Sequence, residues 1–203
     1  MKILALGAHP DDIEIGVGGT LIKYAKAGAD VLAVVIMLPM MDAGRRRESE
    51  NAAGIMGVRL EILEPDSDQL HFNRQLVGIF DALLERGKPD IIFTHWNHDS
   101  HQDHNAVSKS VLAAARANRC SLYMYEQTIP GGIVPDAFQP QLFIDISDEI
   151  DTKMASIRAH KSQFEKNGEW WEYGIKGRAQ YRGYQMNTKY AEAFEIVKQI
   201  NRL

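Results

Sequence analysis

Short apolar runs alternate with longer amphipathic stretches through the first half of the chain. The runs with the length of a strand are Ile3–Leu6, Val31–Met37, Leu60–Leu63 and Ile91–Thr94. All but the third are almost continuously apolar, which is typical of strands buried on both faces. Helical periodicity follows each of them, over Gly18–Ala27, Arg46–Met56, Gln75–Arg86 and Asn105–Ala117. This alternation predicts a Rossmann-like α/β fold, with a mostly parallel sheet flanked by helices on both faces.

The second half of the chain has a less regular pattern. Leu122–Tyr125 and Leu142–Ile146 have the composition of two further strands, and Asp148–Phe164 has the period of a helix. The segment Glu165–Asn187 carries several Trp and Tyr residues among glycines and charges, without a clear period, and predicts a long loop or lid. The amphipathic segment Lys189–Ile200 predicts a final helix.

Composition narrows the class of protein. The 203 residues fit one domain that spans positions 1–203, and 45% hydrophobic with 25% charged residues is ordinary globular composition. With 23 basic and 27 acidic residues, the net charge of −4 indicates neither a nucleic-acid partner nor an anionic membrane surface. No apolar run approaches the ~18 residues of a membrane span, and the first residues are too short a run for a signal peptide. The single Cys120 excludes an internal disulfide and favours a cytoplasmic location.

Two polar segments carry the chemistry, and each directly follows a predicted strand. Ala8–Asp12 (AHPDD) follows the first strand, and His95–His104 (HWNHDSHQDH) follows the fourth and contains four of the seven histidines. Ligands of open α/β sheets bind beyond the carboxyl ends of the strands, so this fold places both segments at one edge. Zinc hydrolases use three ligands of these residue types and keep a fourth position for water. The two segments therefore predict a catalytic metal site.

The roles within these segments follow only in part from spacing. Hydrolysis needs metal ligands and also a free carboxylate that moves the proton, and the adjacent Asp11 and Asp12 can divide these roles. Which does which is left open, because the proline before them and the turn into a helix disturb simple alternation. His101 and His104 are spaced i, i+3 before a helix and can face the same side. His95 ends the strand, where a structural role is the alternative.

A glycine run and a basic run have less specific interpretations. Gly16–Gly19 lacks the GxGxxG spacing of a dinucleotide loop, so we expect a tight turn and close helix packing rather than a nucleotide cofactor. Arg45–Arg47 is most simply a solvated helix end. Neither run predicts a function by itself.

Taken together, these segments resemble the LmbE/PIG-L family of metal-dependent N-acetylglucosaminyl deacetylases. The family's AHPDD motif stands complete, followed by its GGT at Gly18–Thr20, and its second motif is matched by Pro89–Phe93 and His101–His104. Between them, the family's R-x-x-E-x-x-x-A-x-x-x-hydrophobic-Gly pattern is matched by Arg45, Glu48, Ala52, Met56 and Gly57. Later matches are Lys153, Ala155 (one place early), His160–Gln163 and the AEAF segment Ala191–Phe194. The resemblance covers the chain from end to end.

The resemblance implies a role for each residue of the two main segments. It makes His9, Asp12 and His104 the metal ligands, and Asp11 the general base that activates water and then protonates the amine. It makes His101 a stabiliser of the oxyanion. The implied reaction is hydrolysis of the N-acetyl amide of a small amino-sugar conjugate, such as a glycoside or sugar nucleotide, with release of acetate. The implied metal is Zn²⁺, although two histidines and a carboxylate also suit Fe²⁺.

The resemblance also indicates where a substrate binds. It places Arg45 in the pocket, where its charge suits an anionic group on the substrate, and it aligns Asp68, or alternatively Asp66, with an acidic residue that binds sugar hydroxyls. We interpret Trp170, with Trp171, as a platform for a sugar ring or an apolar aglycone, with packing or a subunit contact as the alternative. The region of about 120–190 is where the family varies and selects substrates. Assembly into a homo-oligomer is also expected.

Three other functions use the same residues. One is hydrolysis of an amide that is not a sugar, and another is a binding protein that kept the pocket but lost catalysis, although no ligand or base is missing. The third is an iron oxygenase built on His9, Asp11 and His104. Such oxygenases have all-β folds, so the βα alternation of this chain disfavours that reading.

Overall fold

A computed structural model describes residues 1–37, 42–63, 69–127 and 129–201. Within these ranges the sheet has the strand order β3-β2-β1-β4-β5-β7-β6. The strands are β1 (Lys2–Gly7), β2 (Asp30–Val35), β3 (Arg59–Ile62), β4 (Ile91–His95), β5 (Ser121–Tyr125), β6 (Leu142–Asp145) and β7 (Ala191–Lys198). Strands β1 to β5 pair in parallel, whereas β7 runs antiparallel to both β5 and β6. The predicted Rossmann-like, mostly parallel α/β fold is confirmed.

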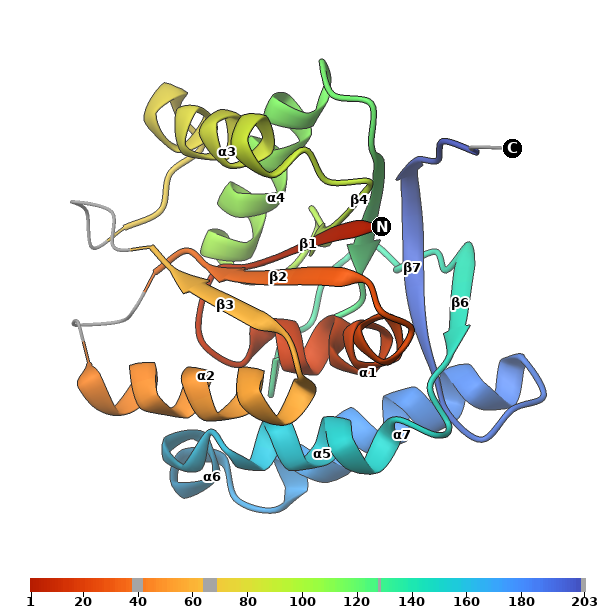
Figure 1. Ribbon diagram of the computed structural model, residues 1–203. Coiled ribbons are helices and arrows are strands. Elements are labelled where there is room, and N and C mark those ends of the chain that lie inside the picture. Colours follow the sequence, from red (N-terminus) through yellow and green to blue (C-terminus); the bar gives the residue numbers. More distant parts are fainter. Residues whose placement is uncertain (38–41, 64–68, 128, 202–203) are drawn as a thin grey trace.

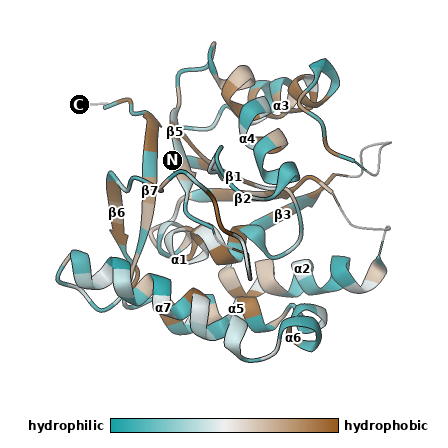
Figure 2. Ribbon diagram, turned by 180° about the vertical axis from the view of Figure 1, so that it is seen from behind, coloured by the Kyte–Doolittle hydropathy of each residue, from teal (hydrophilic) through white to brown (hydrophobic). Residues whose placement is uncertain are grey.

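Helices cover both faces of this sheet (Figure 1). They are α1 (Asp12–Lys26), α2 (Ala43–Met56), α3 (Arg74–Gly87), α4 (Gln102–Ala115), α5 (Ile150–Arg158), α6 (Lys161–Asn167) and α7 (Trp170–Gln185). Leu4 and Leu6 of β1 pack on the side of α3 and α4, and the alternate residues Ile3 and Ala5 pack on the side of α1. In the view from behind, β6 and β7 are largely hydrophobic and much of α7 is hydrophilic (Figure 2). None of the helices in the described ranges combines the length and apolarity that a membrane crossing requires.

The predicted loop over Glu165–Asn187 is wrong, because most of this segment forms α7. One stripe of that helix, Trp171, Ile175 and Ala179, is spaced by four residues and buried against α1 and α5. Glycines inside the helix and exposed aromatic side chains on its other faces hide this period in the sequence. Burial of a narrow apolar stripe therefore outweighs weak helix propensity here.

The predicted final helix over Lys189–Ile200 is also wrong, because its core is strand β7. The segment AEAFEIVK contains good helix formers, but its backbone pairs with both neighbouring strands and Phe194 is fully buried between the layers. Strand formation is decided by such tertiary packing more than by local preference. The predicted helix Asp148–Phe164 is divided into α5 and α6, with the buried His160 at the break.

The glycine run lies inside α1, so the predicted turn is wrong and the predicted close packing is confirmed. Helix α1 begins at Asp12, six residues before the predicted start. A Cβ atom at Gly16 would lie 2.2 Å from the Tyr125 ring, and one at Gly19 would lie 2.8 Å from Ile146. The glycines let α1 approach these side chains closely.

We expect Gly16→Ala to destabilise the protein by about 1–3 kcal/mol, since the added methyl group overlaps the buried Tyr125 ring. Urea unfolding measures the change. Gly54→Ala in α2 is the matched control, because nothing lies within 4 Å of the new methyl group. The control is expected to keep or gain about 0.5–1 kcal/mol. Equal stability of the two variants would contradict the packing argument.

Candidate active site at the carboxyl ends of the strands

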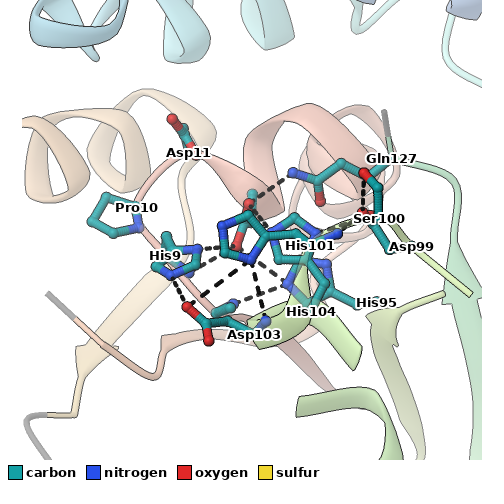
Figure 3. A network of polar contacts seen from close by, with 12 residues as sticks. His9, Pro10, Asp11, His95, Asp99, Ser100, His101, Asp103, His104 and Gln127 are labelled. Carbon is teal, nitrogen blue, oxygen red and sulfur yellow. Dashed lines mark hydrogen bonds and ion pairs between the residues drawn. The ribbon is translucent and has the colours of Figure 1, made fainter. Parts of the chain in front are cut away.

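The two polar segments meet at one edge of the sheet. Strands β1 and β4 are parallel neighbours, so the residues that follow them emerge side by side. The rings of His9, His101 and His104 gather there (Figure 3), with ring centroids 4.9 Å apart for His9 and His101 and 4.6 Å apart for His101 and His104. The described residues contain two overlapping groups that could hold a metal ion, His9 with His101 and His104, and Asp12 with His95 and His104.

Asp12 lies between the two histidines of the ligand set implied by the resemblance. Its Oδ1 is 3.3 Å from Nε2 of His104, and its Oδ2 is 3.7 Å from Nδ1 of His9. Ligand atoms held about 2.0–2.1 Å from a tetrahedral Zn²⁺ lie roughly 3.3 Å from one another. The spacing and the donor chemistry of these side chains thus fit one divalent ion.

Both histidines are oriented by a second carboxylate. Asp99 Oδ2 lies 2.9 Å from Nδ1 of His104, and Asp103 Oδ2 lies 2.9 Å from Nε2 of His9. Metal-binding histidines usually bond a carboxylate through the nitrogen that does not face the metal. No sequence pattern assigned a role to Asp99 or Asp103, although their interleaving with the histidines was the available signal.

His95 has a different task. Its ring is fully buried and stacks on His104 at 3.9 Å, and its Nε2 accepts the backbone N–H of Ala8 at 2.9 Å. Burial and the neighbouring His104 lower the pKa of His95 to about 4, so the ring is neutral. Nε2 is also 3.2 Å from Asp12. The Ala8 nitrogen lies closer and always carries a proton, so Nε2 accepts that proton and carries none of its own. The lone pair of Nε2 is thereby used, which supports a structural role for His95.

Asp12 and His104 form a buried ion pair. Burial raises the pKa of Asp12, but the charge and hydrogen bond of His104 outweigh this effect and hold that pKa well below its usual range. Burial lowers the pKa of His104, but Asp12 and Asp99 outweigh it and raise that pKa to about 10. Gln127, just after β5, also donates to Asp12 Oδ1 at 2.7 Å, and nothing in the sequence indicated this contact. The site stabilises a positive charge beside Asp12, and a metal ion held there would compete with the proton on His104.

Asp11 has a backbone conformation that is rare for a residue with a side chain. Its φ of 94° is left-handed, a strain of about 1–3 kcal/mol that is characteristic of functional sites. Its carboxylate points away from the imidazole rings in Figure 3, and Oδ2 lies 3.5 Å from Nη2 of Arg45. Burial and the charge of Asp12 raise the pKa of Asp11 to about 7, against the lowering effect of His160 and Arg45. A carboxyl group with such a pKa exchanges protons readily near neutral pH.

Arg45 lines the site but is largely occupied with the protein itself. It is 8% exposed, and its guanidinium donates to the Pro10 carbonyl at 2.6 Å and to Ser162 Oγ at 3.3 Å. Ser162 Oγ in turn donates to Glu48 at 2.7 Å. Arg45 therefore holds the turn that carries Asp11, a contact that the basic run did not reveal.

A cleft of about 760 Å³ opens over these residues. Its lining includes His9, Asp11, Asp12, Arg45, His101, His104, Gln127, Ile129, Ser162, Gln163, Lys166 and Trp171. Trp170 is not among the lining residues and is 57% exposed, whereas its neighbour Trp171 does line the cleft. The predicted sugar-binding residue Asp68, like Asp66, lies outside the described residues.

His101 presents a hydrogen-bond donor to this cleft. Its Nδ1 accepts the backbone N–H of Asp103 at 3.2 Å, and burial together with His104 lowers its pKa. The ring is therefore neutral at pH 7, and the proton is on Nε2. A neutral imidazole with Nε2–H suits stabilisation of a developing oxyanion.

Comparison with known families identifies the class to which this fold and site belong. Residues 4–115, more than half of the chain, match the PIG-L family model, described as GlcNAc-PI de-N-acetylase, and the chain belongs to this family. An uncharacterised deacetylase of Escherichia coli is 33% identical over 79% of this chain and 90% of its own length. The diacetylchitobiose deacetylase of Thermococcus kodakarensis is 27% identical over 97% of this chain and 83% of its own length. The resemblance noted in the sequence is confirmed.

Solved structures extend the likeness to the whole fold. A conserved protein from Thermus thermophilus superposes with a TM-score of 0.85 at 25% identity, over 99% of this chain and 96% of its own. The 4-carboxy-2-hydroxymuconate hydratase of Pseudomonas putida superposes with a TM-score of 0.81 at 20% identity, over 100% and 98% of the two chains. This second likeness shows the fold alone, so the function has to be argued from the site.

We expect Asp99→Asn to weaken metal binding by about 10–100-fold, because the neutral amide no longer polarises His104. Competition with a chromophoric chelator measures the affinity. Asp136→Asn is the matched control, since Asp136 is an exposed carboxylate that contacts His98 of the same histidine-rich segment. Unchanged affinity in Asp99→Asn would show that this carboxylate does not support the ligand.

Proposed function

We propose that the protein is a zinc-dependent N-deacetylase that hydrolyses the N-acetyl amide of a small amino-sugar conjugate. The observation that carries the proposal is the placement of Asp12 between His9 and His104, with both histidines bonded to outer carboxylates, at the floor of a large cleft. His9, Asp12 and His104 hold the metal in this proposal. Fe²⁺ is the alternative ion for the same ligands.

The other residues of the cleft have distinct tasks in this reaction. The bound metal supplies a Lewis acid and an acidic water. Asp11 takes a proton from the attacking water and gives it to the departing amine, so it has to be ionised before attack. Nε2–H of His101 donates to the oxygen of the amide as negative charge develops on it. Arg45 orients the Asp11 turn and adds positive charge at the cleft wall.

An amino-sugar substrate is supported by what the relatives are named for. Several are named as probable N-acetyl-α-D-glucosaminyl L-malate deacetylases or as deacetylases of an inositol glycoside of N-acetylglucosamine, and another is named diacetylchitobiose deacetylase. The cleft is large enough for such a conjugate, since small-molecule sites span about 300–1,000 Å³. Its lining includes Ile129, Gln163, Lys166 and Trp171, which belong to the region of about 120–190 that we propose selects the substrate.

Acetate release from a panel of amides tests the proposal. Metal-stripped protein is reloaded with Zn²⁺ or Fe²⁺ and offered diacetylchitobiose, N-acetylglucosaminyl malate and inositol conjugates, nucleotide sugars, and N-acetyl amino acids as non-sugar amides. We expect metal-dependent acetate release from a subset of the amino-sugar conjugates. Release from the amino acids alone would replace the sugar by another amide. No release from a fully metal-loaded protein would favour a binding role.

A further inference from the structure

A buried ion pair lies behind the metal-binding turn and takes no part in the proposed reaction. Lys153 of α5 and Glu192 of β7 are 1% and 5% exposed, and Nζ of Lys153 contacts Oε1 of Glu192. Both belong to segments that resemble motifs of the family, namely the helix before His160 and the AEAF segment. Strong burial of two charges requires a reason beyond stability, because such pairs are often no more stabilising than apolar residues of similar size.

The pair binds the two backbone groups of a single helical hydrogen bond in α1. Lys153 Nζ donates to the Ile15 carbonyl at 2.8 Å, and Arg178 donates to the same carbonyl at 2.9 Å. Glu192 accepts the N–H of Gly19 through Oε1 at 2.9 Å. Ile15 C=O and Gly19 N–H are i and i+4, the acceptor and donor of one α-helical hydrogen bond. Side chains from α5 and β7 therefore bind both the carbonyl and the N–H group of that hydrogen bond.

Helix α1 is intrinsically weak at this point. Gly16, Gly18 and Gly19 follow Ile15, and glycine is among the poorest helix formers. Two of them are required by the close approach of Tyr125 and Ile146. The second oxygen of Glu192 accepts the N–H of the next residue, Thr20, at 2.7 Å, which adds a further external contact to the same stretch. Side chains of other elements thus stabilise the helix at the stretch where its own sequence favours a helix least.

The weak stretch lies one turn beyond the metal ligand. Asp12 begins α1, and Ile15 ends the first turn, so the direction of the Asp12 carboxylate depends on how this turn is held. The preceding residue, Asp11, has the strained left-handed backbone. We propose that Lys153 and Glu192 are positioning residues that hold the first turn of α1, and with it Asp12, in the geometry that binds the metal. The proposal builds on the proposed function but concerns the ligand geometry.

The double variant Lys153→Met/Glu192→Leu separates positioning from stability. Removing both charges leaves neither partner of the pair buried alone, and Arg178 keeps the opposite charge of Glu126, so a folded protein is expected. Either single change leaves one charge of the pair without its partner. If the pair positions Asp12, the double variant unfolds cooperatively, binds Zn²⁺ about tenfold or more weakly, and shows an altered visible spectrum with Co²⁺. Its kcat on the best amide falls at least about tenfold, with KM within about twofold, because the ligand geometry acts on the chemical step.

Two further variants calibrate the test. Lys153→Met/Glu192→Gln retains an amide oxygen for the N–H groups of Gly19 and Thr20, and it is expected to recover part of the zinc affinity and of kcat. Arg86→Met/Glu61→Leu is the control, because it removes an ion pair between α3 and β3, on the face of the sheet opposite α1. The control is expected to match the wild type in spectrum, affinity and kcat.

A folded double variant with wild-type zinc affinity, cobalt spectrum and kcat would overturn the proposal. Should that variant not fold, Glu192→Asp is the replacement test, because it keeps the charge and shortens its reach toward Gly19. Wild-type spectrum and affinity in Glu192→Asp would overturn the proposal equally. The metal measurements need no substrate, so they remain decisive even if the wild-type protein releases acetate from no amide, a result that would count against the deacetylase function instead.

Discussion

Replacing Asp11 by asparagine is expected to lower kcat by about 10²–10⁴-fold while bound metal stays near one ion per chain. The amide cannot take a proton from water, but it has nearly the same size and tolerates the left-handed backbone at this position. The Asp11 carboxylate also faces Arg45 and not the imidazole rings, so its loss leaves the ligand set in place. Turnover of the zinc-loaded variant and its metal content by atomic absorption measure the two effects.

The outcome of this substitution distinguishes the role of Asp11 from that of Asp12. Retention of more than about a tenth of wild-type kcat would exclude Asp11 as the general base, since a proton-transfer group contributes at least two orders of magnitude. Loss of the metal along with activity would assign Asp11 to the ligand set instead. The intact Asp12, which accepts the backbone N–H of His9 at 2.7 Å, keeps the turn itself in place.

Replacing His104 by alanine is expected to remove both metal and activity. His104 is 1% exposed, contacts Asp12 and Asp99 on its two nitrogens, and supplies one of only three protein ligands in the proposed set. One ligand's share of a zinc-binding free energy of ~10–16 kcal/mol is about 3 kcal/mol, so the affinity falls by roughly a hundredfold or more. Equilibrium dialysis against zinc at pH 7 measures this change.

His98→Ala is the matched control for this variant. His98 belongs to the same histidine-rich segment but is exposed and contacts Asp136. It is expected to keep wild-type zinc affinity and kcat. Equal metal loss in Asp11→Asn and His104→Ala would refute the division between base and ligand. Full metal retention in His104→Ala would show that His104 is not a metal ligand.

One of the structural relatives shows why variants of the site are needed. A hydratase shares nearly the whole fold at 20% identity, so the arrangement of strands and helices does not by itself specify amide hydrolysis. The reaction depends instead on the side chains at the carboxyl edge of the sheet and on the residues that line the cleft. Variants at that edge are therefore more informative than any further comparison of folds.

Much of this site could be predicted from local sequence. Apolar runs buried on both faces mark the parallel strands, and polar residues directly after β1 and β4 have to emerge together because these strands are parallel neighbours. His9 and His104 are close for that reason, although about ninety residues separate them. The Pro-Asp-Asp turn, the histidine spacing and the family resemblance all follow from residues near one another in the chain.

Other features were decided only by tertiary structure. Strand β7 has the composition of a helix and becomes a strand because β5 and β6 supply its hydrogen bonds, and α7 is a helix because a narrow stripe of it is buried. Arg45 turns inward to the Pro10 carbonyl, and Lys153 reaches Ile15 across 138 positions of the chain. Local propensity and spacing contain no information about such distant partners. The sequence by itself therefore determined which polar residues meet and at which edge of the sheet they lie. The folded chain alone decided their orientation, burial and charge, because these depend on hydrogen bonds and ion pairs between remote segments.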